Sequence, residues 1–445
     1  MRKPTLINAV AVAMAGVAAA FPGMDQTLAE IEKRQGPLST SLIGDLAELA
    51  DKDLGATGRA IKNILTGRES GQRERAESVG KDKCCIWKYI ADEMHAAMAG
   101  SAERCNDFAR QAVRMGFHDA GTWSKSTGKK SGADGSILLV RECDERRENK
   151  GLLEICAQMR IWFDKHKEFG IGMADLIQFG ATVGTVSCPL GPRIRSFIGR
   201  KDSKEPSPKG LLPGPSASAD TLISMFEDKT ISPAGLAALT GAHTTSQQRN
   251  MQPDPAGDPQ DSTPGVWDTL YCRETTSKDA PKRVLKLQSD MNLANDTHTR
   301  GTWRSFSSAF IGQIKWNQAY SREHVRLSLL GVYNINELTE CTKALPNFMG
   351  SFDSPVKKQL QDFLRGGRDS IATDALLHRD KLPGPSGLVG ISRDDMLTNF
   401  FPLRMGIIEK AGGSKGQTWA SFLVARAHDR DLFMVMFHDS RATPH

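Results

Sequence analysis

The stretch 108–136 constrains this chain more than any other part of its sequence. It places Arg114 and His118 four residues apart, so in a helix both side chains project from one face, one turn apart. A permanent cation and a proton acceptor would then share one pocket. The stretch therefore predicts a helix with a catalytic face.

A calcium-binding pattern follows this helix directly. Asp119 comes immediately after the histidine, and a short loop later the segment GADGS carries Gly132, Asp134 and Ser136 at alternate positions. Carboxylate, carbonyl and hydroxyl oxygens are the hard ligands that calcium prefers. The pattern predicts a cation site immediately behind the catalytic face.

A second histidine, His243 in the segment AALTGAHT, carries the other half of the prediction. A lone histidine at the end of a helix is more often structural than a metal ligand. The following loop, DSTPGVWD, favours a functional role because it repeats the calcium pattern, and Thr244 offers one more oxygen. The oxygen-bearing residues expected in this second site are Thr244, Asp261, Thr263, Val266 and Asp268.

Helical patterns dominate the region from Cys84 to about Pro346. Apolar residues recur at helical spacing in 86–94, and 216–226 and 232–241 have the composition of further helices. The last of these would begin with Ser232 as its N-cap and a proline in its first turn. Because strand-like alternation is scarce, a mainly α domain is expected.

The termini differ from this region. Two basic residues and then the apolar run 6–20 are typical of an export signal, and the run is short for a membrane span. A buried N-terminal helix is the weaker alternative. The predicted organisation is a signal peptide at 1–20, a propeptide or N-terminal extension and linker at 21–80, the main domain at 81–346 and a C-terminal extension of unknown role at 347–445.

The charge and hydropathy patterns argue against nucleic acid and membrane as partners. The formal net charge is +6, and no run of lysine and arginine alternates with aromatic residues as on a nucleic-acid-binding surface. No later apolar stretch is long enough to span a membrane. A secreted monomer that binds neither nucleic acid nor a bilayer is expected.

The cysteine count fits an exported protein. Eight cysteines permit up to four disulfides, whose pairing the sequence leaves open, and no CxxC spacing indicates zinc. Asn295 begins an Asn-Asp-Thr sequon and is a candidate glycosylation site. The cysteines are Cys84, Cys85, Cys105, Cys143, Cys156, Cys188, Cys272 and Cys341.

Eight motifs between residues 84 and 346 follow a familiar order. They are RMGFHDA, GADGSI, ADLIQFGA, FIGRKDS, LLPGPSASADTLI, ISPAGLAALTGAHT, DSTPGVWD and KLQSD. In this order the chain resembles the secreted haem peroxidases of the plant, fungal and bacterial superfamily, and in particular the fungal class II enzymes related to lignin and manganese peroxidases. The resemblance implies a mainly α, two-lobed fold with haem b between a distal and a proximal helix, and two calcium ions.

The resemblance also implies roles on the distal side. His118 matches the base that takes a proton from hydrogen peroxide and returns it to the departing oxygen. Arg114 matches the arginine that stabilises the developing negative charge. Phe117 stands where the secreted classes have phenylalanine, and Asn149 matches the asparagine that accepts the second ring N–H of the distal histidine.

On the proximal side, His243 matches the axial iron ligand and Asp290 the carboxylate that binds its other nitrogen. The two calcium patterns match the distal and proximal calcium sites. The resemblance implies the disulfide Cys105–Cys188 and a link from Cys84 or Cys85 to Cys341. Cys143–Cys156 would be an added local disulfide.

The implied function is oxidation of small phenols or aromatic amines by hydrogen peroxide, through a high-valent iron intermediate. Specialised donor sites are absent from the matching positions: Ala238 replaces the surface tryptophan of lignin-type enzymes, and Gln260 replaces an aromatic residue. The carboxylates that bind manganese are replaced by Asp107, Gln111 and Arg249. Two alternatives remain, a manganese- or lignin-type peroxidase with a non-standard site, and a non-catalytic secreted protein that binds haem and calcium.

Overall fold

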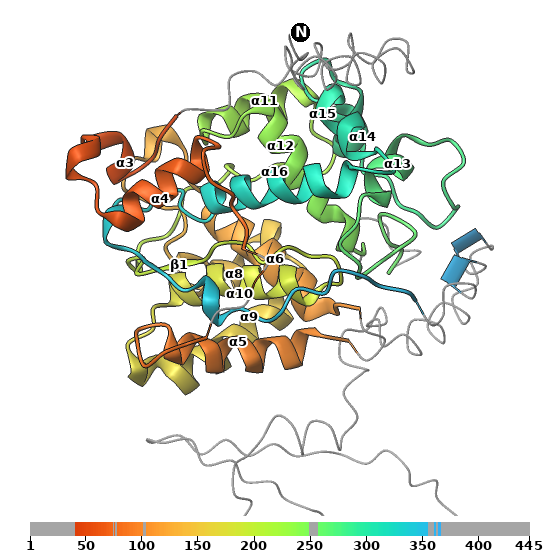
Figure 1. The fold of residues 1–445 in the computed structure, drawn as a ribbon. Coiled ribbons are helices and arrows are strands. Elements are labelled where there is room, and N and C mark those ends of the chain that lie inside the picture. Colours follow the sequence, from red (N-terminus) through yellow and green to blue (C-terminus); the bar gives the residue numbers. More distant parts are fainter. Residues whose placement is uncertain are drawn as a thin grey trace, which may run out of the picture. The chain divides into compact units, whose positions relative to one another are not determined.

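The computed structural model describes residues 41–73, 75, 78–100, 104–248, 257–354, 360–361 and 364–365. They all belong to one compact unit, Met1–Gly390. The prediction of a mainly α fold is confirmed, because helices connected by long loops make up this part of the chain (Figure 1). Its one sheet is small, with β1 (Phe197–Ile198) antiparallel to β2 (Thr339–Glu340). Among the described helices, none is long and apolar enough to cross a membrane.

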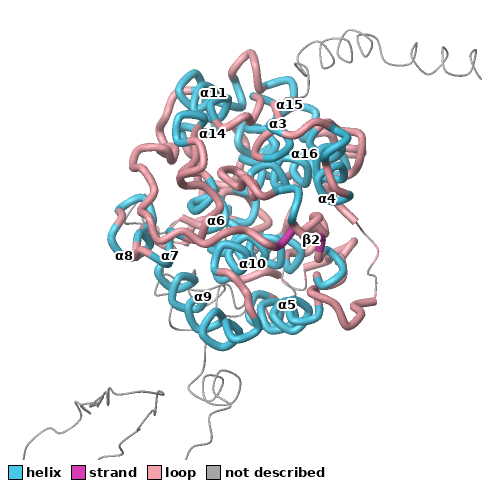
Figure 2. The backbone as a smooth tube through the Cα atoms, turned by 90° about the vertical axis from the view of Figure 1, so that its left-hand side faces the viewer, coloured by secondary structure: helices cyan, strands magenta, loops and turns pink. Residues whose placement is uncertain are grey.

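One group of helices surrounds α10 (Met173–Ser187), every residue of which is buried. The neighbours of α10 are α5 (Cys85–Met98), α6 (Asp107–Ala120) and α9 (Leu153–His166), and Figure 2 shows α5, α9 and α10 close together. An apolar sequence without charges in its last turns suits α10 to this central place. The helix α6, which carries Arg114 and His118, is thus held against the most buried element of the fold.

Two glycines let α6 and α10 approach closely. A Cβ atom at Gly116 would lie 2.7 Å from the Cβ of Ala181, and one at Gly184 would lie 2.8 Å from the carbonyl oxygen of Ala109. Because neither contact admits a side chain, larger residues there would push the helices apart. The position of the catalytic helix is therefore fixed by backbone packing.

Short helical segments line the chain between α6 and α10. The segments are η2 (Lys125–Thr127), α7 (Ser136–Leu139), α8 (Glu142–Glu145), η3 (Arg147–Asn149) and η4 (Lys167–Phe169). Ile137 and Leu138 of α7 and Cys143 of α8 belong to the core.

A second group of helices carries the other histidine. Ser232 caps α12 (Pro233–Thr240) by accepting a hydrogen bond from the amide of Gly235 at 3.1 Å, as the sequence predicts. The five-residue η5 (Gly241–Thr245), which contains His243, continues this helix. The remaining members are α11 (Ala219–Asp228), α13 (Leu270–Thr276), α14 (Gln288–Asn295), α15 (Arg300–Phe306) and α16 (Gly312–Leu327).

Trp316 of α16 fixes the start of η5. Its indole N–H donates to the carbonyl of Ala238 at 2.9 Å, and a Cβ atom at Gly241 would lie only 2.2 Å from the indole nitrogen. The absence of a side chain at Gly241 therefore allows the ring to pack directly beneath the turn that leads to His243.

Part of the predicted N-terminal extension is folded onto the main domain. Residues 43–65 form α3 (Asp45–Glu48), η1 (Asp51–Asp53) and α4 (Ala56–Leu65), and α4 packs against α16 and η6 (Ile335–Glu337). Arg326 donates to the carbonyls of Ser41 and Leu65 at 2.7 and 3.3 Å. Most of the large apolar residues of this segment are buried, Leu49 being exposed; the buried ones are Ile43, Leu46, Leu54, Ile61, Ile64 and Leu65. The predicted signal peptide and residues 21–40 lie outside the described part of the chain.

The beginning of the predicted C-terminal extension also contacts the domain. After η7 (Thr342–Ala344), the amide of Leu190 donates to the carbonyl of Met349 at 2.8 Å. The Arg104 guanidinium lies 5.2 Å from the ring centre of Phe352. Residues 366–445 lie outside the described residues.

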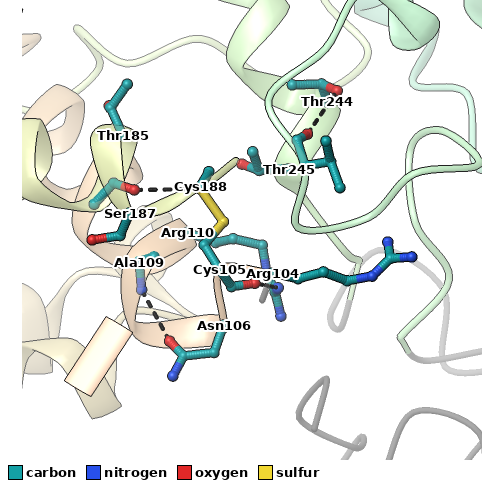
Figure 3. The surroundings of a disulfide bond; sticks show 12 residues. Arg104, Cys105, Asn106, Ala109, Arg110, Thr185, Ser187, Cys188, Thr244 and Thr245 are labelled. Carbon is teal, nitrogen blue, oxygen red and sulfur yellow. Dashed lines mark hydrogen bonds between the residues drawn. A yellow bond between two sulfur atoms is a disulfide. The ribbon is translucent and has the colours of Figure 1, made fainter. Parts of the chain in front are cut away.

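The described residues contain three disulfides: Cys84–Cys341 and Cys105–Cys188 join segments far apart in the sequence, and Cys143–Cys156 is local. Cys105–Cys188 ties the residues before α6 to the end of α10, and Thr244 and Thr245 of η5 belong to its surroundings (Figure 3).

Cys85 and Cys272 are free, so three of the up to four disulfides that the sequence permits are formed, and Cys84 rather than Cys85 is the partner of Cys341. Cys85 follows Cys84 on a helix, so the two side chains point in different directions and only one reaches Cys341. Cys272 is buried in α13, whereas Cys85 lies on α5 in the other group of helices (Figure 1).

Candidate active site

The distal half of the site is built on α6. The side chain of Asn106 caps this helix by accepting hydrogen bonds from the amides of Phe108 and Ala109 at 3.0 and 3.4 Å. Two turns into the helix, Arg114 Nε donates to His118 Nε2 at 3.1 Å. The predicted pair is thus brought together on one helix face.

Asn149 of η3 sets the orientation of the His118 ring. Its Oδ1 lies 2.8 Å from His118 Nδ1, and its Nδ2 donates to the carbonyl of Glu142 at 2.9 Å. Because the amide nitrogen is occupied, Oδ1 faces the ring and accepts the N–H of Nδ1. The unprotonated nitrogen is then Nε2, which faces Arg114.

The backbone beside Asn149 holds the arginine. Arg114 Nη1 donates to the carbonyl of Lys150 and Nη2 to that of Glu148, each at 3.1 Å. Three consecutive residues, 148–150, therefore position both distal side chains. Sequence reasoning found Asn149 but missed the two carbonyls, because a backbone contact leaves no side-chain signature.

The surroundings keep His118 neutral. Burial and the positive charge of Arg114 lower the pKa of His118 to about 3, although the Asn149 hydrogen bond acts in the opposite direction. Phe117 lies edge-on to the ring with centroids 5.7 Å apart, and it stacks on Phe226. A neutral imidazole held in one tautomer can act as a general base.

The proximal half of the site contains His243 of η5 and Asp290 of α14. His243 Nδ1 lies 2.9 Å from Oδ2 of the buried Asp290. Burial opposes protonation of His243, but the carboxylate outweighs it and raises the pKa of the ring. The remaining nitrogen, Nε2, is available as a ligand.

Arg114 and His243 lie near enough for the charge of one to affect the other. The His243 side chain is 39% exposed, and Arg114 is exposed as well, yet burial among protein atoms lowers the pKa of Arg114. The charge of Arg114 also lowers the pKa of His243, which opposes the effect of Asp290. His243 offers one free ring nitrogen as a ligand, and His118 is a neutral base in the distal half. This combination suits a haem.

The distal cation residues converge behind His118. Asp119 Oδ1 is buried without a hydrogen-bond partner, and burial together with the charge of Asp134 raises the pKa of Asp119 well above its usual range. Asp134 Oδ1 accepts from the amide of Ser136 at 3.0 Å. Gly132 has a φ of +113°, and a Cβ atom there would lie 2.2 Å from the Leu330 carbonyl oxygen. A buried carboxylate, a half-buried one and a buried oxygen without a hydrogen-bond partner fit a bound calcium.

The proximal cation residues form a similar cluster. Asp261 Oδ2 accepts from Thr244 Oγ1 at 2.6 Å, and Asp261 Oδ1 from the amide of Thr263 at 2.9 Å. Burial and Asp268 raise the pKa of Asp261, and burial raises the pKa of Asp268 to about 6. The Val266 carbonyl lies 3.3 Å from Thr244 Oγ1. In the described residues, no three His, Cys, Asp or Glu side chains are grouped so that they could hold a metal ion, and both clusters instead combine two carboxylates with neutral oxygens.

Comparison with known proteins agrees with this geometry. The profile of the family described as peroxidase matches residues 90–309. The chain is 31% identical over 266 residues to ligninase C of Trametes versicolor, covering 54% of this chain and 70% of the relative. The chain belongs to the peroxidase family.

Other relatives have the same character. A peroxidase of Arthromyces ramosus is 29% identical over 301 residues, which cover 63% of this chain and 80% of the relative. Manganese peroxidase 3 of Phlebia radiata is 28% identical over 328 residues, covering 68% and 87%. This peroxidase is therefore a haem-dependent oxidoreductase related to the fungal class II enzymes, and it uses peroxide to oxidise reducing donors.

Proposed function

We propose that Arg114 and His118 activate hydrogen peroxide at a haem b whose iron is bound by His243, and that the electrons come from small phenols or aromatic amines. The observation that carries this proposal is the distal geometry: His118 Nε2 lies 3.1 Å from Arg114 Nε, and its Nδ1 lies 2.8 Å from Asn149.

Each residue has a distinct task in this proposal. When bound, the haem would supply the redox chemistry: it would give electrons to peroxide and take them back from the donors. His118 Nε2 takes the proton from the peroxide oxygen that stays behind and delivers it to the other oxygen, which leaves as water. Arg114 stabilises the negative charge on that oxygen as the O–O bond breaks. Asn149 keeps the proton of His118 on Nδ1 throughout.

The two cation clusters support the proposal by placing the histidines. Asp119 follows His118 directly, and Thr244 follows His243 directly. A calcium bound at either cluster would neutralise its two carboxylates and fix the backbone next to the histidine. We infer two calcium ions with the ligand sets predicted from the sequence.

Small donors are favoured over manganese and lignin. Asp107 is buried and paired with Arg110, and Gln111 bonds Glu154 Oε2 at 3.0 Å, so neither side chain presents a free carboxylate. Arg249 lies outside the described residues. The tryptophans in the described part of the chain are all buried, so none offers a surface site for long-range oxidation: Trp87, Trp123, Trp162, Trp267, Trp303 and Trp316.

We also infer that the mature protein is secreted. Three disulfides fit an oxidising compartment, and the sequon residue Asn295 is exposed at the end of α14, where a glycan would reach solvent. These features accompany the predicted signal peptide at residues 1–20.

The proposal is tested by stopped-flow mixing of the haem-loaded protein with peroxide. His118→Ala should keep its haem and lower the bimolecular rate constant about 10²–10⁴-fold, the usual contribution of a general base. His298→Ala, which removes an exposed histidine, is the matched control and should react normally. An unchanged rate in His118→Ala would show that His118 is not the base. A wild-type protein with a normal haem spectrum and no phenol oxidation would instead favour the non-catalytic alternative.

A further inference from the structure

The carboxylate of Asp290 accepts hydrogen bonds from other residues besides His243. Oδ2 of Asp290 accepts from His243 Nδ1 at 2.9 Å and also from Gln260 Nε2 at 3.0 Å. Its other oxygen, Oδ1, accepts from Ser289 Oγ at 3.1 Å. Asp290, Gln260 and Ser289 are all buried, so water does not compete for these bonds. His243 and Gln260 therefore share one carboxylate oxygen.

The structure fixes the direction in which the Gln260 amide points. Ser246 Oγ donates to Gln260 Oε1, which leaves the Nε2 group facing Asp290. The opposite orientation would bring an amide oxygen against a carboxylate and would lose that bond. The backbone holds the residue as well, because the amide of Gln260 donates to the Ser246 carbonyl at 3.3 Å and an adjacent bridge pairs Gln247 with Pro259.

A donor at Asp290 Oδ2 changes what the carboxylate does to His243. An amide N–H stabilises the negative charge of the carboxylate, so Asp290 draws the Nδ1 proton of His243 less strongly. A less anionic imidazole gives less electron density to the iron and stabilises its ferric state less. The reduction potential of the haem rises accordingly.

We propose that Gln260 tunes the potential of this peroxidase, by competing with His243 for Asp290 and thereby making the haem a stronger oxidant. This inference rests on the proposed ligation of the iron by His243. It extends the range of donors toward phenols and aromatic amines that are harder to oxidise, without requiring an additional substrate site. Gln260 is a positioning residue in this scheme, since it acts only through Asp290.

The test compares three variants of the haem-loaded full chain. Gln260→Leu removes the donor and keeps a similar volume. Ser246→Ala removes the hydroxyl that orients Gln260. Gln313→Leu is the matched control, because Gln313 is a partly buried glutamine that donates two hydrogen bonds, to Trp267 and Asn317, and does not contact Asp290.

The readouts are the ferric/ferrous midpoint potential and the iron–histidine stretching frequency of the ferrous protein. Gln260→Leu should favour the ferric state about tenfold, equivalent to about 59 mV for a one-electron couple, and should raise the stretching frequency. Ser246→Ala should shift both in the same direction by less, and Gln313→Leu should shift neither.

Two kinds of failure are distinguishable. An iron–histidine stretch that is absent from the wild-type protein would contradict ligation by His243, and with it the proposed function. A normal stretch with an unchanged or raised potential in Gln260→Leu would overturn the tuning role alone. If Gln260→Leu does not fold, an unchanged potential in Ser246→Ala overturns it equally.

Discussion

His118 and His243 occupy parallel places in the two halves of the molecule. Each lies near the end of a helical segment, each is followed directly by a residue of a cation cluster, and each bonds an oxygen through Nδ1. The oxygen belongs to the Asn149 amide in one case, at 2.8 Å, and to the Asp290 carboxylate in the other, at 2.9 Å. The two arrangements differ mainly in the charge of this partner.

The charge of the partner separates the two side chains chemically. Burial and Arg114 lower the pKa of His118 to about 3, which leaves a neutral base. Asp290 raises the pKa of His243 against the effect of burial, which makes its ring the more electron-rich ligand. The comparison teaches that the group at Nδ1, together with the neighbouring cation, divides the work between two chemically identical side chains.

Removing the positive charge of Arg114 should have the largest effect on the comparison, because it slows the reaction with peroxide. Arg114→Leu should lower the rate constant of the peroxide reaction about 10²–10³-fold, because the developing charge on the leaving oxygen loses its stabilising donor. Stopped-flow kinetics measure this, with Arg160→Leu as the control, since Arg160 pairs with Asp144 away from the site. Equal rates in both variants would refute the role of Arg114.

Opening the Cys143–Cys156 disulfide should affect the distal half alone. Its sequence separation of 13 encloses residues 148–150, which contact Arg114 and His118. The double serine variant should lose about 3 kcal/mol of stability and react more slowly with peroxide, while the iron–histidine signal stays unchanged.

The control for this experiment is Cys85→Ser, which removes a free cysteine. Denaturant unfolding and stopped-flow kinetics provide the two readouts. A double variant with normal peroxide kinetics would show that the disulfide does not position the distal residues.

Calcium removal should destabilise both halves. At a calcium concentration 100 times the dissociation constant, each bound ion contributes about 2.7 kcal/mol, which a chelator would remove. Thermal unfolding with chelator and with calcium restored measures the loss. Asp134→Ser should perturb mainly the peroxide rate and Asp268→Ser mainly the iron–histidine signal, whereas an identical effect on both readouts would contradict the separation of the two sites.

A third histidine, His324, is buried like His118 but takes no part in the site, so it shows what burial alone does to a histidine. His324 of α16 is buried with Nε2 unpartnered, and burial, with a contribution from Arg200, lowers its pKa to about 4. The unfolded chain, with a pKa near 6.5, takes up this proton first, so stability is complete above pH 6.5 and declines as the pH falls toward 4.

Replacing this histidine should flatten that decline. Between pH 7 and pH 5, His324→Leu should lose about 2 kcal/mol less stability than the wild-type protein, as measured by urea unfolding at each pH. The peroxide rate should not change, because a low pKa alone does not make a catalytic base. An unaltered pH dependence of stability would contradict the buried neutral state.

Side-chain pattern made much of the site predictable from the sequence. The four-residue spacing of Arg114 and His118 places both side chains on one helix face, and the oxygen-bearing residues of the two loops predict the cation clusters. The main domain was recognisable because its ordered motifs carry distinctive polar residues. Site features of this kind depend on residue type and spacing, both of which a sequence displays.

Other features depend on packing that no local pattern displays. Residues 43–65 look like a polar extension, yet their apolar positions match a surface formed by α16 and η6, which lie far away in sequence. The contact of Gln260 with Asp290 spans 30 residues and appears in the sequence only as a missing aromatic residue. The carbonyls of residues 148 and 150 are invisible because every residue has one.

The most direct test of the central claim treats His118→Ala and His243→Ala in parallel. The account predicts that His118→Ala keeps the iron–histidine stretch and loses its reaction with peroxide, whereas His243→Ala loses the stretch and regains it on addition of imidazole. A stretch that survives in His243→Ala, or a peroxide reaction that survives in His118→Ala, would contradict the division of labour between the two histidines.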